Sequence, residues 1–533
     1  MSIDTFFNKR NIFQIYISKS LDHFDRIKKI YNLSDYHDKN KQLLIFGLYD
    51  NDDLKILKNH KTSLSLMWGG SDANDNIESS RKIINIVKNS KKNIKHYAIS
   101  INIKERLNSH KITSELLNLN LIDYEIFKPV NTSNKNSIYI YNGYSPNSEN
   151  LYGNYQEIVK RLPEQKYIFS NSLNLPHNKM PEIYSQCFIG LRLCNIDGNA
   201  NTVKEFEAMN IDIIHNGDHE HSIKWKTYDD VELTIRYKHI DIFNEKIKKY
   251  KNILFLCNDY PSYGGAATNC AKLVKFYSDN GHRTFGIFTH FEKDINYIND
   301  DDNIIINNGY KNIKKCFEKC FTYFDGAPDL IIFRSYWNID FVDNIKCPKY
   351  FFIPGLFLDH LNIDYKLIDK NNYKKYINLN VVDLARKCDA SYCNSEHTSK
   401  ILKKLFKIDT QFMYFNYVPF YGLYIKKYDD FKMRKYDIIV CVSNFNRQIK
   451  NLDNFIDSVK QSKYSLLLIG KNSNKYLNKN IINIDLIDNK HINSYLLDTK
   501  YIYCNSFYES CSNILIEAKF CGCKSITSLD DVC

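Results

Sequence analysis

The chain has 533 residues, enough for about three to four domains of ordinary size. Hydrophobic residues make up 44% and charged residues 25%, a globular composition that excludes a disordered or fibrous chain. The formal net charge of +12 suits acidic ligands such as nucleotides or phosphates, and also weak contact with a membrane surface. The sequence lacks the dense Lys/Arg run that is typical of a nucleic-acid-binding arm. We therefore expect no nucleic-acid partner and at most peripheral membrane contact.

The cysteines and the N-terminus indicate the compartment. There are 15 cysteines, and neither a CxxC pair nor a His-bearing zinc spacing is present. We therefore expect reduced thiols that serve as small apolar residues, and no metal site. The first ten residues lack a signal-peptide pattern, and no apolar run reaches the ~18 residues that span a bilayer. A soluble, cytoplasmic protein is expected.

The first predicted domain comprises residues 1–130, where strand-like and helix-like segments alternate. The strand predicted over 63–68 ends in Trp68-Gly69-Gly70-Ser71-Asp72. Glycines after a strand let the backbone turn sharply and approach a ligand. A ligand-binding turn and a purely structural turn are equally consistent with this stretch. The alternation predicts a compact Rossmann-like domain.

The second predicted domain comprises residues 131–245. Its predicted strands and helices alternate, with strands at 138–141, 166–170, 188–193 and 212–215 and helices at 150–162 and 180–186. Arg192 lies in the third strand and is able to bind a phosphate bidentately. Asn201 and Thr202 are candidate caps for the helix that follows. Together with two acids they form a possible second site: Arg192, Asp197, Asn201, Thr202 and Glu207.

A charged, helix-prone stretch at 241–251 reads as the connector to a third domain, 246–430. There a strand at 252–257 leads through Gly264 and Gly265 into a helix that runs to about Asp279, which is a βαβ unit with a glycine-rich first loop. These glycines permit backbone N–H groups to approach a phosphate or sugar. The third glycine of a GxGxxG dinucleotide fingerprint is missing. Further along, 294–315 is predicted to be a surface loop with a short strand, and Ser395 to cap a helix over 396–405.

The last predicted domain, 431–533, opens with a strand at 436–443. Arg447 and Lys450 follow, three residues apart, which places both on one side of a helical turn. Arginine presents a planar fork of donors and lysine a point charge. The pair is therefore a candidate phosphate contact, although a solvated charge pair is an alternative.

Near its end the chain reads strand, loop, helix and strand. The strand covers 501–506, Ser512 or Asn513 caps a helix that runs to about Phe520, and Gly522 ends it. Glu509 lies in the loop before the helix. Glu517 lies inside the helix among apolar residues, where a carboxylate is costly to bury without a partner. Two acids at a helix N-terminus, which is an anion site, suit a sugar nucleotide: the acids take hydroxyls and the helix end takes the diphosphate.

This stretch resembles a known family. Glu509-x7-Glu517, followed by Ala518 and Cys521-Gly522-Cys523, is similar to the donor-site motif of family-4 glycosyltransferases, which have the GT-B fold. In that family the first Glu contacts the transferred sugar and the second holds the ribose. A glycine loop placed like Gly264 and Gly265 lies beside the donor, and a basic pair meets the diphosphate.

The resemblance implies transfer of a sugar from a nucleotide-sugar donor to a hydroxyl of a glycan, protein or lipid acceptor. By resemblance the reaction retains the anomeric configuration and needs neither metal nor cofactor. Glu509, Arg447 and Lys450 would then be catalytic, and the donor-binding residues would be Gly264, Gly265, Ser512, Asn513 and Glu517.

The same order of elements occurs about 310 residues earlier, where Glu207-Ala208-Met209 takes the place of Glu517-Ala518-Lys519. Asn199 stands eight residues before Glu207, where the motif has Glu. We therefore expect an α/β fold of tandem GT-B-like modules, each built from two doubly wound Rossmann-like domains. The first module is expected to be divergent but ligand-capable.

Two other functions remain open. One is a non-catalytic binding or scaffold protein made of decayed transferase modules, and the other is a nucleotide-sugar epimerase with the same fold. The chain ends at Cys533, soon after the Glu517 helix, whereas family members usually run on to a helix that crosses back to the N-terminal domain. This difference puts closure of the cleft in doubt.

Overall fold

The computed structural model divides into two compact units, residues 1–232 and 233–533. Each unit contains two sheets, and every strand pair in them is parallel. The residues that the structure describes are 12, 14–74, 77–117, 122–131, 135–143, 149–173, 175–194, 200–217, 219, 222–258, 265–290, 303–308, 310, 312–356, 377–423, 431–447, 450–487, 489–506 and 512–527.

Unit 1 begins with a six-stranded sheet in the order β2-β1-β3-β4-β5-β6. Alternate residues of the central strands enter different cores, because successive side chains point to opposite faces: Leu43 and Ile45 pack with α3 and α4, Leu44 and Phe46 with α2. The strands are β1 (Gln14–Ile17), β2 (Ser34–Asp35), β3 (Leu43–Phe46), β4 (Leu64–Trp68), β5 (Ile94–Ala98) and β6 (Ser114–Leu116). The helices are η1 (Lys19–Phe24), α2 (Arg26–Ile30), α3 (Asn51–Asn59), η2 (Ser71–Ala73), α4 (Glu78–Lys88) and α5 (Ile101–Ser109).

The second sheet of unit 1 has four strands in the order β10-β9-β7-β8. One face is covered by α8 and α9, whose Tyr184, Val203 and Phe206 are buried against β7. The strands are β7 (Ser137–Ile140), β8 (Lys166–Phe169), β9 (Cys187–Arg192) and β10 (Asp212–His215). The helices are α6 (Glu149–Tyr152), α7 (Tyr155–Arg161), η4 (Ser170–Ser172), η5 (His177–Lys179), α8 (Met180–Tyr184) and α9 (Asn201–Ala208).

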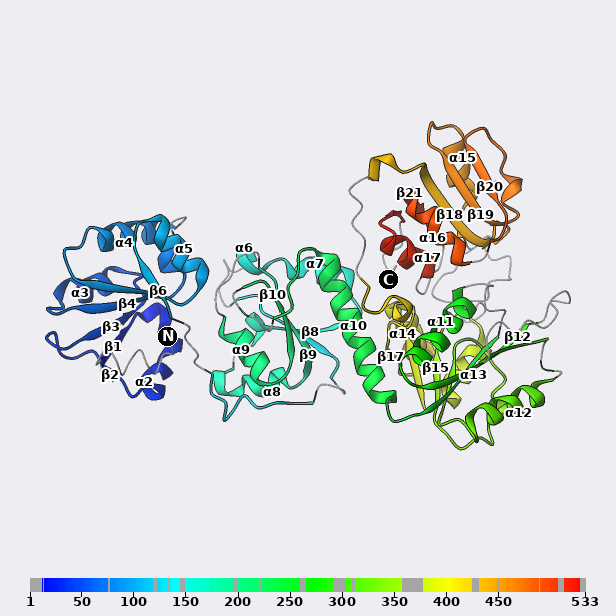
Figure 1. Ribbon diagram of the computed structural model, residues 1–533, viewed down its shortest axis with the longest axis horizontal. Coiled ribbons are helices and arrows are strands. Elements are labelled where there is room, and N and C mark those ends of the chain that lie inside the picture. The colour runs from blue at the N-terminus through cyan, green and yellow to red at the C-terminus, as the bar shows by residue number, and fades with distance from the viewer. Residues whose placement is uncertain are drawn as a thin grey trace. The chain divides into compact units, whose positions relative to one another are not determined.

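One long helix, α10 (Tyr228–Ile247), contains the division between the units (Figure 1). Its residues up to Glu232 belong to unit 1. Ile240, Phe243 and Ile247 are buried in a core of unit 2. The helix-prone character of the predicted connector at 241–251 is therefore confirmed up to Ile247, where α10 ends, and β11 begins at Asn252.

Unit 2 opens with a seven-stranded sheet in the order β13-β12-β11-β14-β15-β16-β17. Numbered from β11 this is 3-2-1-4-5-6-7, the doubly wound Rossmann order with one added strand. The strands are β11 (Asn252–Asn258), β12 (Arg283–His290), β13 (Ile304–Asn308), β14 (Leu330–Phe333), β15 (Lys349–Phe352), β16 (Ala390–Cys393) and β17 (Gln411–Phe412). The helices are α11 (Gly265–Asp279), α12 (Ile313–Phe324), η6 (Ile339–Phe341), α13 (Leu379–Lys387), α14 (Glu396–Phe406) and η9 (Val418–Phe420).

The last sheet has five strands in the order β20-β19-β18-β21-β22, again 3-2-1-4-5 from its first strand. Helices α16 and α17 cover one face and α15 the other. The strands are β18 (Tyr436–Asn444), β19 (Leu466–Lys471), β20 (Ile481–Ile484), β21 (Thr499–Tyr503) and β22 (Lys524–Ile526). The helices are η10 (Phe431–Met433), α15 (Asp453–Lys460), η12 (Ser473–Lys475), α16 (Asn489–Leu497) and α17 (Asn513–Phe520).

Local sequence signals are partly confirmed. Ser395 caps α14 by accepting the Thr398 N–H at 3.4 Å. Gly522 follows the end of α17 with φ +75°, the left-handed conformation that terminates helices. The helix predicted at 150–162 is interrupted after Tyr152, and a second helix starts at Tyr155. The loop predicted at 294–315 does contain a short strand, β13, but its last residues already begin α12.

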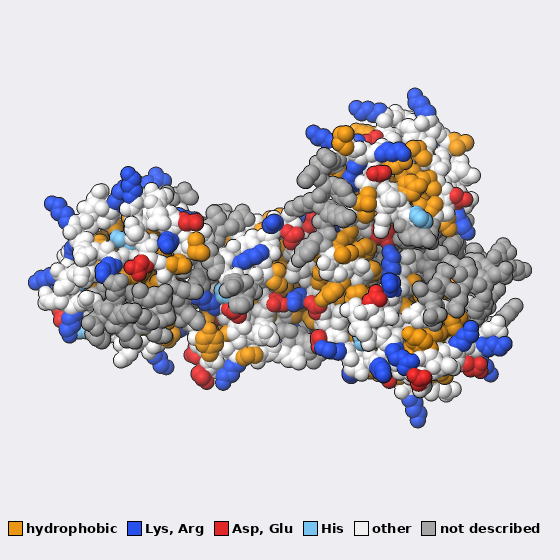
Figure 2. Space-filling model, in the orientation of Figure 1, with side chains coloured by type: hydrophobic (Ala, Val, Ile, Leu, Met, Phe, Trp, Pro, Cys, Tyr) orange, Lys and Arg blue, Asp and Glu red, His pale blue; other side chains and the backbone are white. Residues whose placement is uncertain are grey.

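The predicted α/β fold class is confirmed by the four parallel sheets, two in each unit, and by the helices that cover them, which are consistent with Rossmann-like domains. Across the residues described, no helix has the length and apolar character needed to cross a bilayer. On the face drawn in Figure 2, Lys and Arg side chains are dispersed and interspersed with acidic ones, and do not form one basic patch.

Candidate functional site

The strand order of unit 2 places two crevices at defined points. In the seven-stranded sheet the order reverses between β11 and β14, and in the five-stranded sheet between β18 and β21. Ligands of open α/β sheets bind outside the carboxyl ends of the strands at such a reversal. Helix α11 follows β11, and α17 follows β21. Both helices therefore begin at a reversal point.

The N-termini of α11 and α17 meet (Figure 1). The side-chain amide Nδ2 of Asn513, the first residue of α17, donates to the carbonyl oxygen of Gly265, the first residue of α11, at 2.7 Å. A Cβ atom at position 265 would lie 3.1 Å from that nitrogen, so glycine permits this approach. Two helix N-termini bring two partial positive charges together, and an anion between them would be stabilised.

Glu517 lies one turn further along α17 and is buried, with 3% of its surface exposed. Its Oε1 accepts a hydrogen bond from Nζ of Lys272, on α11, at 2.8 Å. Burial raises the pKa of the Cys441 thiol on β18, and the negative charge of Glu517 raises it further. The carboxylate therefore lies between α11 and the central strand of the five-stranded sheet.

Apolar contacts hold the same two helices together. Ile516 and Phe520 of α17 are buried in the core that also contains Leu273 of α11. The ring of Phe520 stacks on Phe420 of η9, with ring centroids 4.6 Å apart. The predicted donor-binding residues Gly265, Asn513 and Glu517 are thus brought together in a packed interface between the two α/β domains of unit 2.

The predicted basic pair follows the other strand at the reversal point, β18. The Arg447 N–H donates to the Asn444 carbonyl and the Lys450 N–H to the Arg447 carbonyl, which forms two successive turns. The Arg447 guanidinium Nη1 donates to Oγ of Ser443 at 3.2 Å. Both cations therefore stand at the carboxyl end of β18, the strand beside β21.

The remaining predicted residues of this site either do not cap α17 as expected or lie outside the described residues. Ser512 occupies the position before α17, but its side chain makes no capping hydrogen bond. Asn513 is the first helical residue and is not a cap. Glu509 and Gly264 lie outside the described residues.

Arg334, which is not among the predicted site residues, directly follows β14 at the reversal point and is 2% exposed. Its Nε donates to Oδ1 of Asn269 on α11 at 2.9 Å, and its Nη2 to Oδ1 of Asn416 at 2.8 Å. The guanidinium lies 4.4 Å from the ring centroid of Phe415, and burial lowers its pKa to about 10. Arg334 thereby ties α11 to the segment that leads towards the last domain.

The repeat in unit 1 has a different register from the one predicted. Helices α9 and α17 both have eight residues, and both are followed by a left-handed residue, Asn210 and Gly522. The hydrogen bonds of Met209 N–H to the Glu205 carbonyl and of Cys521 N–H to the Glu517 carbonyl correspond. The structural counterpart of Glu517 is therefore Glu205, and not Glu207, so the predicted register is wrong by two residues.

Glu205 is as buried as Glu517 but has partners from its own α/β domain. Its Oε1 lies 2.6 Å from Nε2 of His177, and its Oε2 accepts from the Tyr184 hydroxyl at 3.0 Å. Both carboxylate oxygens are thus occupied by neighbouring side chains.

The remaining residues of the possible second site do not form one cluster. The Arg192 guanidinium lies over the rings of Tyr141, at 3.9 Å, and Tyr152, at 5.0 Å, and Nη2 donates to the Tyr152 hydroxyl. Helix α9 starts at Asn201 after Ala200, so neither Asn201 nor Thr202 caps it, and that prediction is wrong. Asp197 lies outside the described residues.

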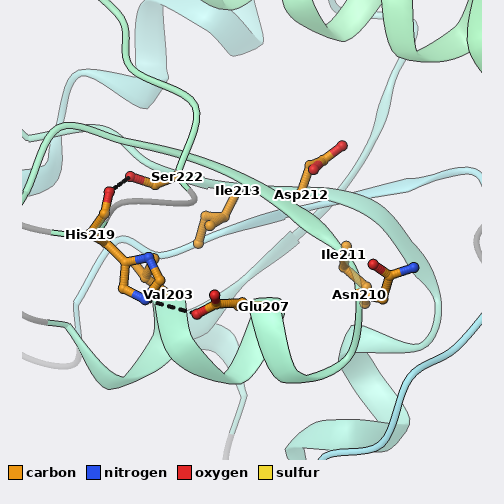
Figure 3. Close-up of a pocket in the computed structure, with 8 residues that line it drawn as sticks. All are labelled: Val203, Glu207, Asn210, Ile211, Asp212, Ile213, His219 and Ser222. Carbon is orange, nitrogen blue, oxygen red and sulfur yellow. Dashed lines mark hydrogen bonds and ion pairs between the residues drawn. The ribbon is translucent and has the colours of Figure 1, made fainter. Parts of the chain in front are cut away.

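Glu207 instead lines a pocket of about 190 Å³, shown in Figure 3. Its Oε2 lies 3.0 Å from Nε2 of His219, whose carbonyl oxygen accepts the Ser222 hydroxyl at 2.9 Å. Asp212, at the start of β10, also lines the pocket, whereas Arg192 pairs with the last residue of that strand. Asp212 and His215, the residue that pairs with Arg192, are three residues apart along β10, which corresponds to about 10 Å. The full lining is Val203, Glu207, Asn210, Ile211, Asp212, Ile213, His219 and Ser222.

Among the residues that the structure describes, no three His, Cys, Asp or Glu side chains are grouped to hold a metal ion. The cysteines in the described segments are free thiols, most of them buried.

No protein-family model matches the chain, and no curated protein matches it. Several solved structures are similar. Sucrose-phosphate synthase from Thermosynechococcus elongatus has 13% identity and a TM-score of 0.36, over 51% of this chain and 80% of that one. An α-glucosyltransferase in complex with UDP-glucose and DNA containing an abasic site has 12% identity and a TM-score of 0.36, over 52% of this chain and 79% of that one.

UDP-N-acetylglucosamine 2-epimerase from Rickettsia bellii has 12% identity and a TM-score of 0.33, over 53% of this chain and 80% of that one. Each of these three likenesses has an identity below 25% and a TM-score below 0.5. The chain's own sheets define its fold, and the carboxyl ends of β11, β14, β18 and β21 hold the candidate site.

Proposed function

We propose that unit 2 is a glycosyltransferase that moves a sugar from a nucleotide-sugar donor to an acceptor hydroxyl. The observation that carries the proposal is the meeting of the α11 and α17 N-termini at strand-order reversals, with the buried carboxylate of Glu517 one turn away. A diphosphate suits the two helix ends. A carboxylate that accepts hydroxyl hydrogen bonds suits the ribose.

The proposal gives each group a role. Backbone N–H groups near Gly265, Ser512 and Asn513 bind the diphosphate. Arg447 and Lys450, at the end of the adjacent strand, offset the charge that grows on the diphosphate as the glycosidic bond breaks, which is electrostatic catalysis. In the family that the sequence resembles, Glu509 would orient the sugar. The same resemblance supports retention of the anomeric configuration.

Turnover of a panel of UDP- and GDP-sugars by the full chain tests the proposal. We expect slow donor hydrolysis, and transfer when an acceptor glycan is added. Glu517→Gln should abolish both, whereas the exposed Glu207→Gln should leave them unchanged. If the chain releases nucleotide from none of the donors and Glu517→Gln leaves UDP and GDP affinities unaltered, the transferase proposal is refuted.

Two further arms separate the alternatives. An epimerase converts the donor without acceptor and without releasing nucleotide, so an epimerised sugar recovered from a donor-only reaction contradicts transfer. We also propose that transfer needs no divalent cation. Activity that survives EDTA supports this, and activity restored only by Mg²⁺ or Mn²⁺ contradicts it.

A specific observation favours a non-catalytic role for unit 1. Both oxygens of Glu205 are occupied by His177 and Tyr184, and the Arg192 guanidinium lies against the rings of Tyr141 and Tyr152. We therefore expect Glu517→Gln alone to remove all nucleotide release. Release that persists in this variant but is lost on Arg192→Met would instead assign activity to unit 1.

A further inference from the structure

Lys272 is a partly buried lysine that pairs with the buried Glu517 of another domain. It lies on α11, and its ammonium group contacts Glu517, which is 245 residues away in the sequence. Its side chain is 35% exposed, whereas that of Lys275, on the same helix, is 78% exposed and pairs with Asp279 one turn on. The ammonium also lies 5.8 Å from the ring centroid of Phe420. Lys272 is thus directed into the interface between the two domains of unit 2.

The surroundings of Glu517 explain why a cation is needed there. The neighbouring residues Leu515, Ile516, Ala518 and Phe520 are all buried, so the carboxylate stands in an apolar helix face. An ionised carboxylate in such a place is strongly disfavoured unless a cation and hydrogen bonds compensate it. Within the described part of the chain, Lys272 is the group that does so.

The pair leaves acceptor capacity unused. An ionised carboxylate has two oxygens and about four acceptor positions. Lys272 binds Oε1, and across the residues described no side chain or backbone group bonds Oε2. The ammonium has three donors, of which this contact uses one. The arrangement therefore fixes the plane of the carboxylate and keeps one oxygen for a hydroxyl.

The charge of the pair also matters for an anionic ligand. Glu517 is four residues into α17 from Asn513, about 6 Å along the axis at the helical rise. A lone negative charge at that distance from the helix N-terminus would repel a diphosphate bound there. Pairing with Lys272 makes the Glu517–Lys272 pair neutral overall and offsets that repulsion.

We propose that Lys272 is a positioning residue for ribose recognition: it holds the Glu517 carboxylate so that Oε2 receives the ribose hydroxyls. The inference rests on the proposed nucleotide-sugar function. It adds that α11, in the first α/β domain of unit 2, controls the contact between ribose and Glu517, which lies in the second α/β domain of that unit. Ribose binding then requires that the two domains be in contact.

Calorimetric binding of UDP, 2′-deoxy-UDP, GDP and 2′-deoxy-GDP to the full chain tests the proposal. We expect the wild type to prefer the ribonucleotide of the base it binds by about tenfold, the equivalent of one good hydrogen bond. Lys272→Met should remove most of this preference. Lys272→Arg should retain it, and Lys275→Met, the matched control on the same helix, should leave it unchanged.

The ratio of ribo to deoxy affinity separates positioning from a structural role. A Lys272→Met variant that unfolds at a lower temperature but keeps the ratio overturns the inference, because lost packing does not discriminate between sugars. If this variant does not fold, Lys272→Met combined with Glu517→Gln removes the buried charge, and it should show no preference. A wild type that binds none of the four nucleotides refutes the proposed function as well, so the two failures are distinguishable.

Discussion

The turn after β4 allows a quantitative prediction about pH. Asp72 is fully buried and accepts N–H groups of Leu48, Gly69 and Gly70. Burial raises its pKa from 3.8 to about 6, although the backbone donors around it favour the charged form. The folded state therefore binds the proton more tightly than the unfolded state. Stability contributed by Asp72 is fully present below pH 4 and is lost, by about 3 kcal/mol, as the pH rises to 6.

His96, on the adjacent strand β5, has the opposite effect. Its Nδ1 accepts the indole N–H of Trp68, and burial lowers its pKa from 6.5 to about 4. The unfolded state therefore binds the proton more tightly. Stability contributed by neutral His96 is present above pH 6.5 and is lost as the pH falls to 4. The shift corresponds to about 3 kcal/mol, which solvent screening of a partly exposed ring reduces to about 2 kcal/mol. The two residues together predict a nearly flat stability between pH 4 and 6.5.

Single substitutions should reveal the two slopes. Trp68 is buried beside the turn, so its fluorescence reports urea unfolding of this domain in a full-length Trp225→Phe, Trp337→Phe background. Relative to the background, Asp72→Asn should lose about 3 kcal/mol of stability between pH 6.5 and 4, and His96→Gln should gain about 2 kcal/mol. Equal differences at both pH values refute the reasoning. A relative gain by Asp72→Asn at pH 4 would mean that the backbone donors outweigh burial.

Three further outcomes are expected. Glu205→Gln should destabilise unit 1 by about 2 kcal/mol or more, because both buried oxygens are bonded, whereas Glu207→Gln should change it by less than about 0.5 kcal/mol; equal effects in chemical denaturation would reject the Glu205 register. Gly470→Ala places a Cβ atom 1.8 Å from a backbone oxygen, whereas Gly281→Ala, also at positive φ, meets no atom within 4 Å; thermal unfolding should show a loss of several kcal/mol for the first and about 1 kcal/mol for the second. Arg447→Met should weaken UDP or GDP binding and reduce its salt dependence, with nucleoside binding unchanged; equal losses for nucleotide and nucleoside would place Arg447 away from the diphosphate.

Features set by neighbouring residues were accessible from the sequence. The alternation of strands and helices gave the fold class, because parallel strands buried on both faces are continuous apolar runs. Ser395 and Gly522 were identified because capping depends on one residue and the helix beside it. Glu517 stood out because a carboxylate in an apolar helix needs a partner.

Features set by distant residues were not accessible. Lys272 has the same local sequence signal as the solvated Lys275, and only the packing of α17 on α11 distinguishes them. The register of the repeat failed for a related reason. Glu205 and Glu207 are two residues apart, and the left-handed residue that ends α9 is Asn210, a less recognisable terminator than Gly522. Arg334 had no recognisable signal in the sequence, because its amide partners Asn269 and Asn416 come from two other segments.

The two equivalent carboxylates show how one helix position supports different roles. Glu205 is satisfied at both oxygens by side chains of its own α/β domain, so its helix is fixed whether or not a ligand is present. Glu517 is held at one oxygen by a lysine of a different domain, and its partner is lost whenever those domains separate. The buried position in unit 2 therefore depends on contact between two α/β domains, whereas the direct partners of the same position in unit 1 come from one domain.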